Sequence, residues 1–183
     1  MVLIDMERKL DIVHEYVELM HDSRIHVSHD IHDIKTCDIV ITATSAPETL
    51  VTPELVHPGM VIINDAQPSD VSPRVVKERH DVLVIEGGVV HTKGVQSNFH
   101  MGPRGKDENY CCLAEVLVLA HHGHFDNYAT GNLDLSLIDH IEDYSKPLDF
   151  TIAQYQNFIQ GYIPEEQIEH VKQLLQQKIK DRK

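Results

Sequence analysis

The sequence predicts an α/β protein in which a mostly parallel sheet is followed by a helical C-terminal region. The apolar runs of the first half are short, rich in Val and Ile, and nearly continuous, which is typical of strands buried on both faces. Helical or turn-like segments separate these runs, as the crossover connections between parallel strands require. The expected strands are Val2–Ile4, Ile25–Val27, Asp38–Thr44, Val61–Asp65 and Val82–Ile85.

The expected helices differ between the two halves of the chain. In the first half, apolar residues recur at helical spacing between about residues 7 and 21, and prolines open two short crossover helices. The second half, after a loop rich in glycine and proline, carries longer helical patterns. We therefore expect a sheet domain at residues 1–92 and a helical region at residues 93–183. The expected helices are about residues 7–21, Pro53–His57, Ser72–Lys77, Asn109–His121, Leu133–Tyr144, a segment after Pro147, and Pro164–Lys180.

Composition and charge exclude several classes of protein. The 183 residues are 42% apolar and 25% charged, which predicts a folded core and not a disordered chain. The sequence contains neither a membrane-spanning apolar run nor the pattern of a secretory signal. A formal net charge of −13 disfavours nucleic acid and anionic membranes as partners. Because three cysteines do not make a disulfide framework, we expect a cytoplasmic protein.

Several expected strands end in polar or small residues. Parallel α/β sheets bind ligands at this edge, beyond the carboxyl ends of the strands. A carboxylate at the end of a strand accepts hydrogen bonds from ribose hydroxyls in dinucleotide-binding sheets, and small residues let a ligand approach the backbone. Each position also has a simpler explanation, as a helix N-cap or as an ordinary turn residue. Their occurrence in series predicts a cofactor cleft. The candidate cofactor residues are Asp5, Thr44, Ser45, Ala46, Gly87 and Gly88.

One element of a dinucleotide-binding sheet is not found in this sequence. No G-x-G-x-x-G motif, which seats a pyrophosphate on a helix N-terminus, follows any expected strand. In the doubly wound order, the strand that carries this loop is central and precedes the strand that corresponds to Val2–Ile4. We therefore expect a Rossmann-like sheet that lacks its first strand and glycine loop. Such a chain is expected to be part of a longer protein, or to form homo-oligomers through exposed strand edges.

Two groups of segments resemble known proteins. The segments Asp38–Ser45 and Val51–Ile62 are similar to the NAD(P)-binding domains of shikimate dehydrogenases and glutamyl-tRNA reductases. The downstream segments are more specific and resemble the C-terminal half of the long-chain acyl-(acyl carrier protein) reductases. Together, the likeness runs from Met1 to about Ile163. The downstream segments are Val84–Val90, Tyr110–Glu115, Phe125–Tyr128 and Gly161–Tyr162.

The resemblance implies an oxidoreductase that reduces a fatty acyl thioester of acyl carrier protein or CoA to an aldehyde with NADPH or NADH. The family's nucleophile lies in a Cys-x-Ala-Glu segment, which matches Cys112–Glu115. A thiolate attacks the thioester carbon to give an acyl-enzyme, and hydride then releases the aldehyde. Cys112 falls in the first turn of an expected helix, where the helix dipole favours an anion. The alternative is that Cys111 and Cys112 are small, buried core residues.

The sequence departs from this family at two further positions. Asp5 stands where an NADPH enzyme prefers a small or basic residue, which favours NADH, although Arg8 and Lys9 are near enough to contact a 2′-phosphate. His91 is one place away from the family's spacing, so no role is transferred to it.

Two other functions remain open. One is a dehydrogenase of the shikimate or amino-acid type without covalent catalysis, and the other is a non-catalytic Rossmann-derived module that binds a nucleotide or a partner strand.

The remaining histidines and the third cysteine are assigned structural places. His121, His122 and His124 form a histidine-rich turn, to which His91 and His100 add further candidate metal ligands. No carboxylate or cysteine lies at a convincing spacing from them, so we expect a solvated turn and no metal site. Cys37 begins a strand and is expected in the core.

Overall fold

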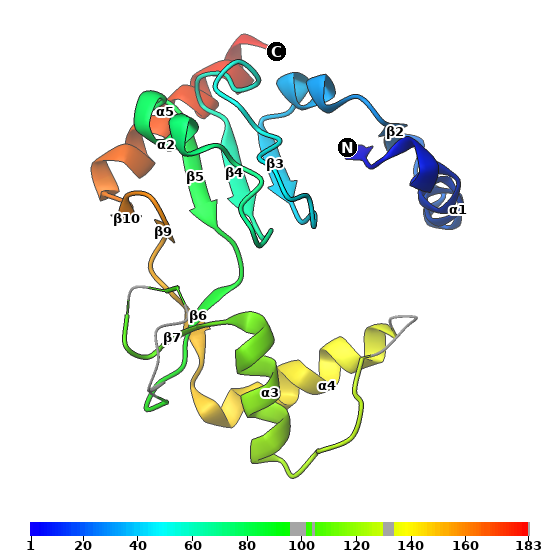
Figure 1. Cartoon of the computed structure of the whole chain (residues 1–183), viewed down its shortest axis with the longest axis vertical. Coiled ribbons are helices and arrows are strands. Elements are labelled where there is room, and N and C mark those ends of the chain that lie inside the picture. Colours follow the sequence, from blue (N-terminus) through cyan, green and yellow to red (C-terminus); the bar gives the residue numbers. More distant parts are fainter. Residues whose placement is uncertain (96–101, 104, 130–133, 183) are drawn as a thin grey trace. The chain divides into compact units, whose positions relative to one another are not determined.

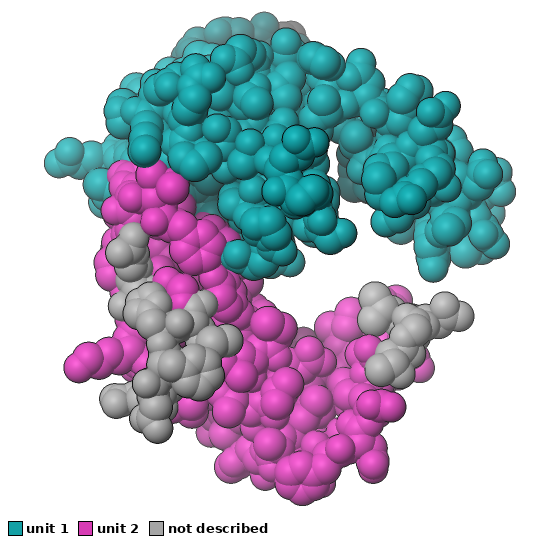
Figure 2. All heavy atoms as spheres, in the orientation of Figure 1, with its two compact units in different colours: residues 1–85, 164–183 teal, residues 86–163 magenta. Residues whose placement is uncertain are grey.

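The computed structural model describes residues 1–95, 102–103, 105–129 and 134–182 of a mixed α/β protein. The chain forms two compact units, which Figure 2 shows in separate colours. The first contains residues 1–85 and 164–183, and the second contains residues 86–163. The division therefore falls after Ile85 and not after residue 92, and the C-terminal helix belongs to the first unit.

A three-stranded sheet forms the centre of the first unit (Figure 1). Its strands are β3 (Ile39–Thr42), β4 (Val61–Asn64) and β5 (Leu83–Glu86), in that order. The first two pair in parallel, and the arrows of all three point the same way in Figure 1. Val40 and Ile62 are buried in the core cluster of this unit. The predicted strands and their parallel arrangement are thus confirmed, although β3 ends at Thr42 and not at Thr44.

Two helices belong to this part of the first unit. The helix α2 (Pro73–Glu78) begins at Ser72, whose hydroxyl accepts a hydrogen bond from the Arg74 N–H. The C-terminal helix α5 (Glu165–Asp181) contributes the fully buried Val171. No helix forms at residues 53–57, where the structure has turns. The helix predicted there is wrong, because Pro53 opens a turn too short to complete a helical ladder.

A separate two-stranded sheet holds the N-terminal residues of the first unit. Strands β1 (Val2–Ile4) and β2 (His26–Ser28) pair in parallel. Between them run a 3₁₀ turn, η1 (Glu7–Lys9), and the helix α1 (Leu10–Met20). A second 3₁₀ segment, η2 (Ile31–Thr36), leads to β3, and Ile4 and Ile31 pack against the core cluster. The half-buried Cys37 packs there too, as predicted.

The second unit mixes strands and helices, so the expectation of a helical region is wrong in part. Its three-stranded antiparallel sheet has β6 (Val89–His91) between β7 (Glu108–Tyr110) and β8 (Thr151–Ile152), and β9 (Gln156–Asn157) pairs with β10 (Gly161–Tyr162). These strands have two or three residues each, which is too short for alternation to be recognisable in the sequence.

The helices of the second unit are α3 (Cys111–His121) and α4 (Leu135–Ser145), followed by the 3₁₀ turn η3 (Lys146–Leu148). The predicted start of α4 at Leu133 lies outside the described residues. The helix expected after Pro147 does not form, because Asp149 adopts a left-handed conformation with φ of 56° and the chain continues into β8. Among the described residues, no helix is long and apolar enough to cross a membrane.

Candidate functional site

The turn Gly87-Gly88 and the start of α3 lie against each other in the second unit. Gly88, at φ of 64°, allows β5 to turn directly into β6. Strand β6 pairs with β7 so that Val89 lies opposite Tyr110, the last residue before α3. The backbone N–H of Cys111 then donates to the carbonyl oxygen of Gly88 at 2.6 Å. A glycine pair and a cysteine pair that are separate motifs in the sequence are thereby brought into one place.

Both cysteines at this site, Cys111 and Cys112, are exposed. The alternative that Cys111 and Cys112 are buried core residues is therefore wrong. Cys112 is the second residue of α3, as predicted, and the side chain of the N-cap residue, Tyr110, makes no capping hydrogen bond. The first turn of a helix presents backbone N–H groups and the positive end of the dipole to an anion. A thiolate, or the oxyanion formed when it attacks a carbonyl, fits this environment.

Tyr110 is a third component of the site, and sequence analysis did not single it out. Burial, followed by the charges of Glu86 and Cys112, raises the pKa of Tyr110 to about 12. At neutral pH its hydroxyl therefore stays protonated and can donate a hydrogen bond. A Cβ atom at Gly102 would lie 2.7 Å from the Tyr110 hydroxyl oxygen. The Tyr110 hydroxyl therefore packs closely against residue 102, where a side chain would collide with it.

A carboxylate network holds the strand that positions Tyr110. Glu108, in β7, accepts hydrogen bonds from the Gly105 N–H and the Gln156 amide, both at 2.8 Å, and from the Tyr162 hydroxyl at 3.1 Å. Next to it, the buried Asn109 amide donates to the Thr92 hydroxyl at 2.5 Å. These contacts join β6, β7, β9 and β10. They fix the backbone from which α3 starts.

The predicted cofactor residues Thr44, Ser45 and Ala46 lie in the first unit, after β3. The Thr44 hydroxyl donates to Asp70 Oδ1 at 2.6 Å, and the Thr44 N–H donates to Asp70 Oδ2 at 3.2 Å. The Ala46 N–H donates to the Thr44 hydroxyl. Asp70 is fully buried. Thr44 therefore supports the turn at the carboxyl end of β3 with the same groups that were expected to meet a ligand.

Asn64 extends this network beneath the end of β4. Its side-chain oxygen accepts hydrogen bonds from the Asp70 N–H at 3.0 Å, the Thr42 hydroxyl at 3.2 Å and the Ser69 hydroxyl at 3.3 Å. Both Asn64 and Asp70 are fully buried. The network ties the carboxyl ends of β3 and β4 to the chain that follows them. Its residues fix the shape of the sheet edge where parallel sheets bind ligands.

Asp5, the predicted ribose ligand, follows β1 in the first unit. Its side chain accepts a hydrogen bond from the Met6 N–H at 2.7 Å, close to the start of η1, which resembles the N-cap role considered as the alternative. Asp5 also lines an open pocket of about 270 Å³. The other lining residues are Leu3, Ile4, Val13 and Tyr16. The carboxylate thus stands at a mostly apolar pocket, where it can still accept hydrogen bonds from a ligand.

The histidine-rich turn packs against aromatic side chains. His122 stacks on Tyr144 with 4.2 Å between ring centroids, and one of its ring nitrogens lies 3.0 Å from the Tyr144 carbonyl oxygen. His124 meets the Tyr128 ring edge to face. In the described ranges, no three His, Cys, Asp or Glu side chains gather in a way that could hold a metal ion. His100 lies outside those ranges.

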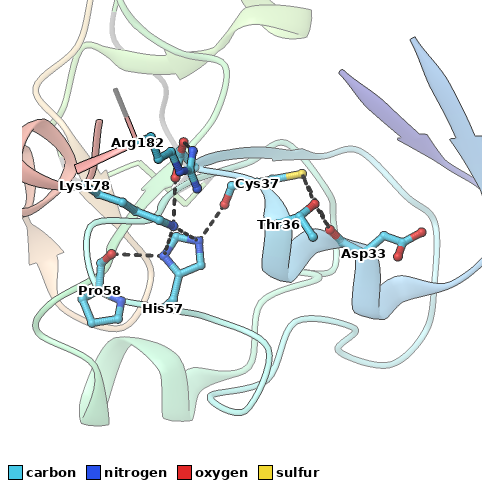
Figure 3. Close-up of polar contacts among 8 residues, drawn as sticks. Asp33, Thr36, Cys37, His57, Pro58, Lys178 and Arg182 are labelled. Carbon is cyan, nitrogen blue, oxygen red and sulfur yellow. Dashed lines mark hydrogen bonds and ion pairs between the residues drawn. The ribbon is translucent and has the colours of Figure 1, made fainter. Parts of the chain in front are cut away.

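A charged cluster at the amino end of β3 fastens α5 to the sheet (Figure 3). Lys178 of α5 lies 3.0 Å from Asp38 and within 3.1 Å of both imidazole nitrogens of His57. A ring nitrogen of His57 lies 2.9 Å from the Cys37 carbonyl oxygen, and Arg182 also pairs with Asp38. Asp38 directly precedes β3, so this cluster lies at the amino ends of the strands. We interpret it as structural.

Asp38 is expected to make stability depend on acid pH. Burial raises its pKa, but hydrogen bonds from Lys178 and Arg182, together with their charges, outweigh burial and hold the pKa of Asp38 below its usual value. Because the pKa is lowered in the folded state, this stabilisation is present above about pH 4 and is lost as the pH falls through the folded pKa. We expect Asp38→Asn to cost about 1–2 kcal/mol at pH 7.

Urea unfolding at pH 7, 5, 4 and 3.5 checks this prediction. The difference in the free energy of unfolding between wild type and Asp38→Asn should shrink at the two lowest pH values. Asp143→Asn, which removes an exposed pair with Lys146 on α4, is the control and should change stability much less. A difference for Asp38→Asn that is independent of pH would contradict the assignment.

Comparison with known proteins finds similarity to a curated protein but no matching family. No protein-family model matches the chain. Over 112 residues, 60% of its length, the chain is 31% identical to the aminotransferase PigE of Serratia sp. (strain ATCC 39006). The matched segment spans 13% of PigE. Most of that protein therefore lies outside the match, and its name describes the whole protein.

Proposed function

We propose that this chain is the downstream part of an NAD(P)H-dependent reductase of acyl thioesters, with Cys112 as the acyl acceptor. The observation that carries the proposal is the hydrogen bond between Cys111 and Gly88. It joins an exposed cysteine in the first turn of a helix to a glycine turn at the end of a strand. These are the two motifs that resemble the long-chain acyl-(acyl carrier protein) reductases most specifically.

The strand order supports a Rossmann-like sheet. The order β2-β1 in one sheet and β3-β4-β5 in the other becomes β2-β1-x-β3-β4-β5 if one strand, x, stands between them. That is the order 3-2-1-4-5-6 of a doubly wound dinucleotide-binding sheet, with the first strand missing. The parallel pairing of β1 with β2 and of β3 with β4 agrees with it.

A nicotinamide cofactor fits part of this chain. Asp5 stands at an open pocket beside Tyr16, where it would hold the ribose hydroxyls of the adenosine. The hydroxyl and N–H of Thr44 are already bonded to Asp70, so Thr44 shapes the binding edge. When bound, the reduced cofactor supplies hydride to the acyl group.

The chain's own residues account for acyl transfer. The Cys112 thiolate attacks the carbonyl carbon of the thioester, a new carbon–sulfur bond forms, and the bond to the carrier breaks, so the carrier thiolate leaves. The backbone N–H groups that follow Cys111 in the first turn of α3, those of Cys112 and Leu113, would face the negative charge that develops on the carbonyl oxygen. The acyl carrier can be CoA or acyl carrier protein.

Acylation of the intact chain by a long-chain acyl-CoA tests the proposal. We expect mass spectrometry to find one acyl group on Cys112, and Cys112→Ser to reduce acylation about 100-fold or more, because a hydroxyl is a far weaker nucleophile than a thiolate. Cys111→Ser is the matched control, because Cys111 is exposed as well. This variant should remain acylated on Cys112. Acylation that follows Cys111, or that is unchanged in Cys112→Ser, would refute the assignment.

The name of PigE raises pyridoxal phosphate chemistry as a second candidate. Enzymes that use pyridoxal phosphate hold this cofactor through a Schiff base to a lysine. Every lysine that the structure describes is exposed except Lys178, which is half-buried and engaged by Asp38 and His57. These residues do not fit that cofactor. We therefore propose no transamination step for this chain.

A further inference from the structure

The two cysteines at the start of α3 are neighbours in the chain. Cys111 and Cys112 are the first two residues of the helix, and both are exposed. Their Cα atoms are about 3.8 Å apart, as in any two residues joined by a trans peptide bond. Both thiols belong to one helical turn of the second unit. A reaction between them therefore involves the second unit alone.

This pair has the two properties of a redox-sensitive thiol. The first turn of a helix favours an anion, and the thiolate is the form of cysteine that a hydroperoxide oxidises. Redox-sensing cysteines also often lie next to a second thiol that resolves the oxidised sulfur. The third cysteine of the chain is placed differently, because Cys37 is half-buried in the first unit with its sulfur 3.8 Å from the Asp33 carbonyl oxygen (Figure 3).

The backbone around the pair allows the first turn of α3 to change while its beginning stays in place. The N–H of Cys111 is bonded to the carbonyl oxygen of Gly88, outside the helix. A disulfide between neighbouring residues closes a ring through the peptide bond that joins them. Closing this ring changes the torsion angles between Cys111 and Cys112, which lie beyond the bonded N–H. Cys111 therefore stays attached to Gly88 while the first turn of α3 opens.

We propose that hydroperoxides oxidise Cys111 and Cys112 to a disulfide, which acts as a reversible switch at the start of α3. The Cys112 thiolate attacks a peroxide oxygen, the oxygen–oxygen bond breaks, and Cys112 becomes a sulfenic acid while water or an alcohol leaves. The Cys111 thiolate then attacks the Cys112 sulfur. The sulfur–sulfur bond forms, the sulfur–oxygen bond breaks, and hydroxide leaves and is protonated to water. Two thiols are oxidised and one hydroperoxide is reduced.

The spacing of the two cysteines makes this bond a switch and not a structural link. Most disulfides join Cα atoms about 4.4–6.8 Å apart, which is more than the distance between neighbouring residues. A departure from the usual geometry strains the bond and makes it easier to reduce. Strained disulfides are the labile and regulatory ones. Cellular thiols would therefore restore Cys111 and Cys112 by thiol–disulfide exchange once the hydroperoxide is removed.

The disulfide would use the sulfur to which we assign the acyl group. A Cys112 sulfur bonded to Cys111 is no longer a thiolate and does not attack a thioester, so oxidation and acylation would exclude each other. This consequence rests on the proposed function. The disulfide itself does not, because its formation requires only the two neighbouring thiols and a hydroperoxide.

Mass spectrometry of the protein after treatment with hydrogen peroxide tests the disulfide. We expect the peptide that carries both cysteines to lose two hydrogen atoms, and dithiothreitol to restore them. The amides of Glu115 and Val116 donate to the carbonyl oxygens of the first two residues of α3, so they should exchange at least about tenfold faster in the oxidised form. A bond from either cysteine to Cys37 or to a second chain would overturn the proposal.

Substitution of each remaining thiol shows which one resolves the oxidised sulfur. In Cys111→Ser, peroxide should leave a sulfenic acid on Cys112 that dimedone labels, and further peroxide should convert it irreversibly to a sulfinic acid. Cys37→Ser is the matched control and should form the same disulfide as the wild type. Dimedone labelling of Cys112 that is equally strong in the wild type and in Cys111→Ser would contradict a resolving role for Cys111.

Acylation of the reduced and oxidised forms by a long-chain acyl-CoA separates this inference from the proposed function. We expect only the reduced form to carry an acyl group on Cys112. If the disulfide forms but neither form is acylated, the proposed function fails and the disulfide stands. Equal acylation of both forms on Cys112 would show that the sulfur is not held in a disulfide, and would refute the switch alone.

Discussion

Replacing Gly59 by alanine is expected to lower the free energy of unfolding of the first unit by about 2–5 kcal/mol. Gly59 has φ of 80°, a region that costs a residue with a Cβ atom about 1–2 kcal/mol. A Cβ atom there would also lie 2.8 Å from the backbone nitrogen of Leu175 and 3.1 Å from the carbonyl carbon of Leu174. Both atoms belong to the backbone of α5, which cannot yield as a flexible side chain does.

The control for Gly59 is a glycine with the same backbone conformation and open surroundings. Gly94 also has φ of 80°, but a Cβ atom there would meet no heavy atom within 4 Å. Gly94→Ala should therefore show the conformational cost alone, about 1–2 kcal/mol. Urea unfolding monitored by circular dichroism gives both values. Equal losses at the two positions would show that α5 does not approach Gly59 as closely as the structure indicates.

Gly59 also shows why the sequence predicts elements better than their contacts. The apolar stripe of α5 is visible in the sequence, and Val171 is fully buried as that stripe predicts. What α5 packs against is not visible, because Gly59 and Leu175 are far apart in the chain and Gly59 looks like an ordinary turn residue after Pro58. The return of α5 to the first unit could therefore not be predicted from periodicity alone.

The strands of the second unit could not be predicted for a different reason. Pairing of β6 with β7 and β8 depends on contacts over long stretches of sequence, such as Val90 with Ile152. Each strand is too short for its own pattern to distinguish it from a loop. By contrast, α3 is apolar at every position from Leu113 to Ala120 except Glu115, and its position was predicted to within two residues.

The candidate site was predicted in pieces. Cys112 and Gly88 follow from motifs, and in the second unit the structure bonds Gly88 to Cys111, the neighbour of Cys112. Asp5, Thr44, Ser45 and Ala46 belong to the first unit. The role of Asp70 was missed because a Ser-Asp pair shortly before a helix resembles a capping sequence. One signal that could have drawn attention to it is the serine-rich, proline-flanked loop at residues 67–73, which has to satisfy its backbone groups near buried strand ends.

Removing the Asp70 side chain is expected to cost about 2–4 kcal/mol, because its buried carboxylate accepts charge-assisted hydrogen bonds from both the hydroxyl and the N–H of Thr44. The backbone of Asp70 remains bonded in Asp70→Ala, with its N–H donating to Asn64 and its carbonyl accepting from Leu50 and Val51. The loss therefore reports on the carboxylate and not on the loop as a whole. Thermal or urea unfolding measures it.

A double-mutant cycle separates the Thr44–Asp70 bond from the other effects of each substitution. Thr44→Val keeps the shape of the side chain but leaves the buried carboxylate with one donor fewer, so we expect a loss of about 1–3 kcal/mol. Because the two residues share a bond, the double variant should lose about 1–2 kcal/mol less than the sum of the single losses. Ser45→Ala, at the exposed neighbouring position, is the control and should be nearly neutral. If the losses simply add, the Thr44 hydroxyl does not bond to Asp70 in solution and is free to bind a ligand, as the sequence alone predicted.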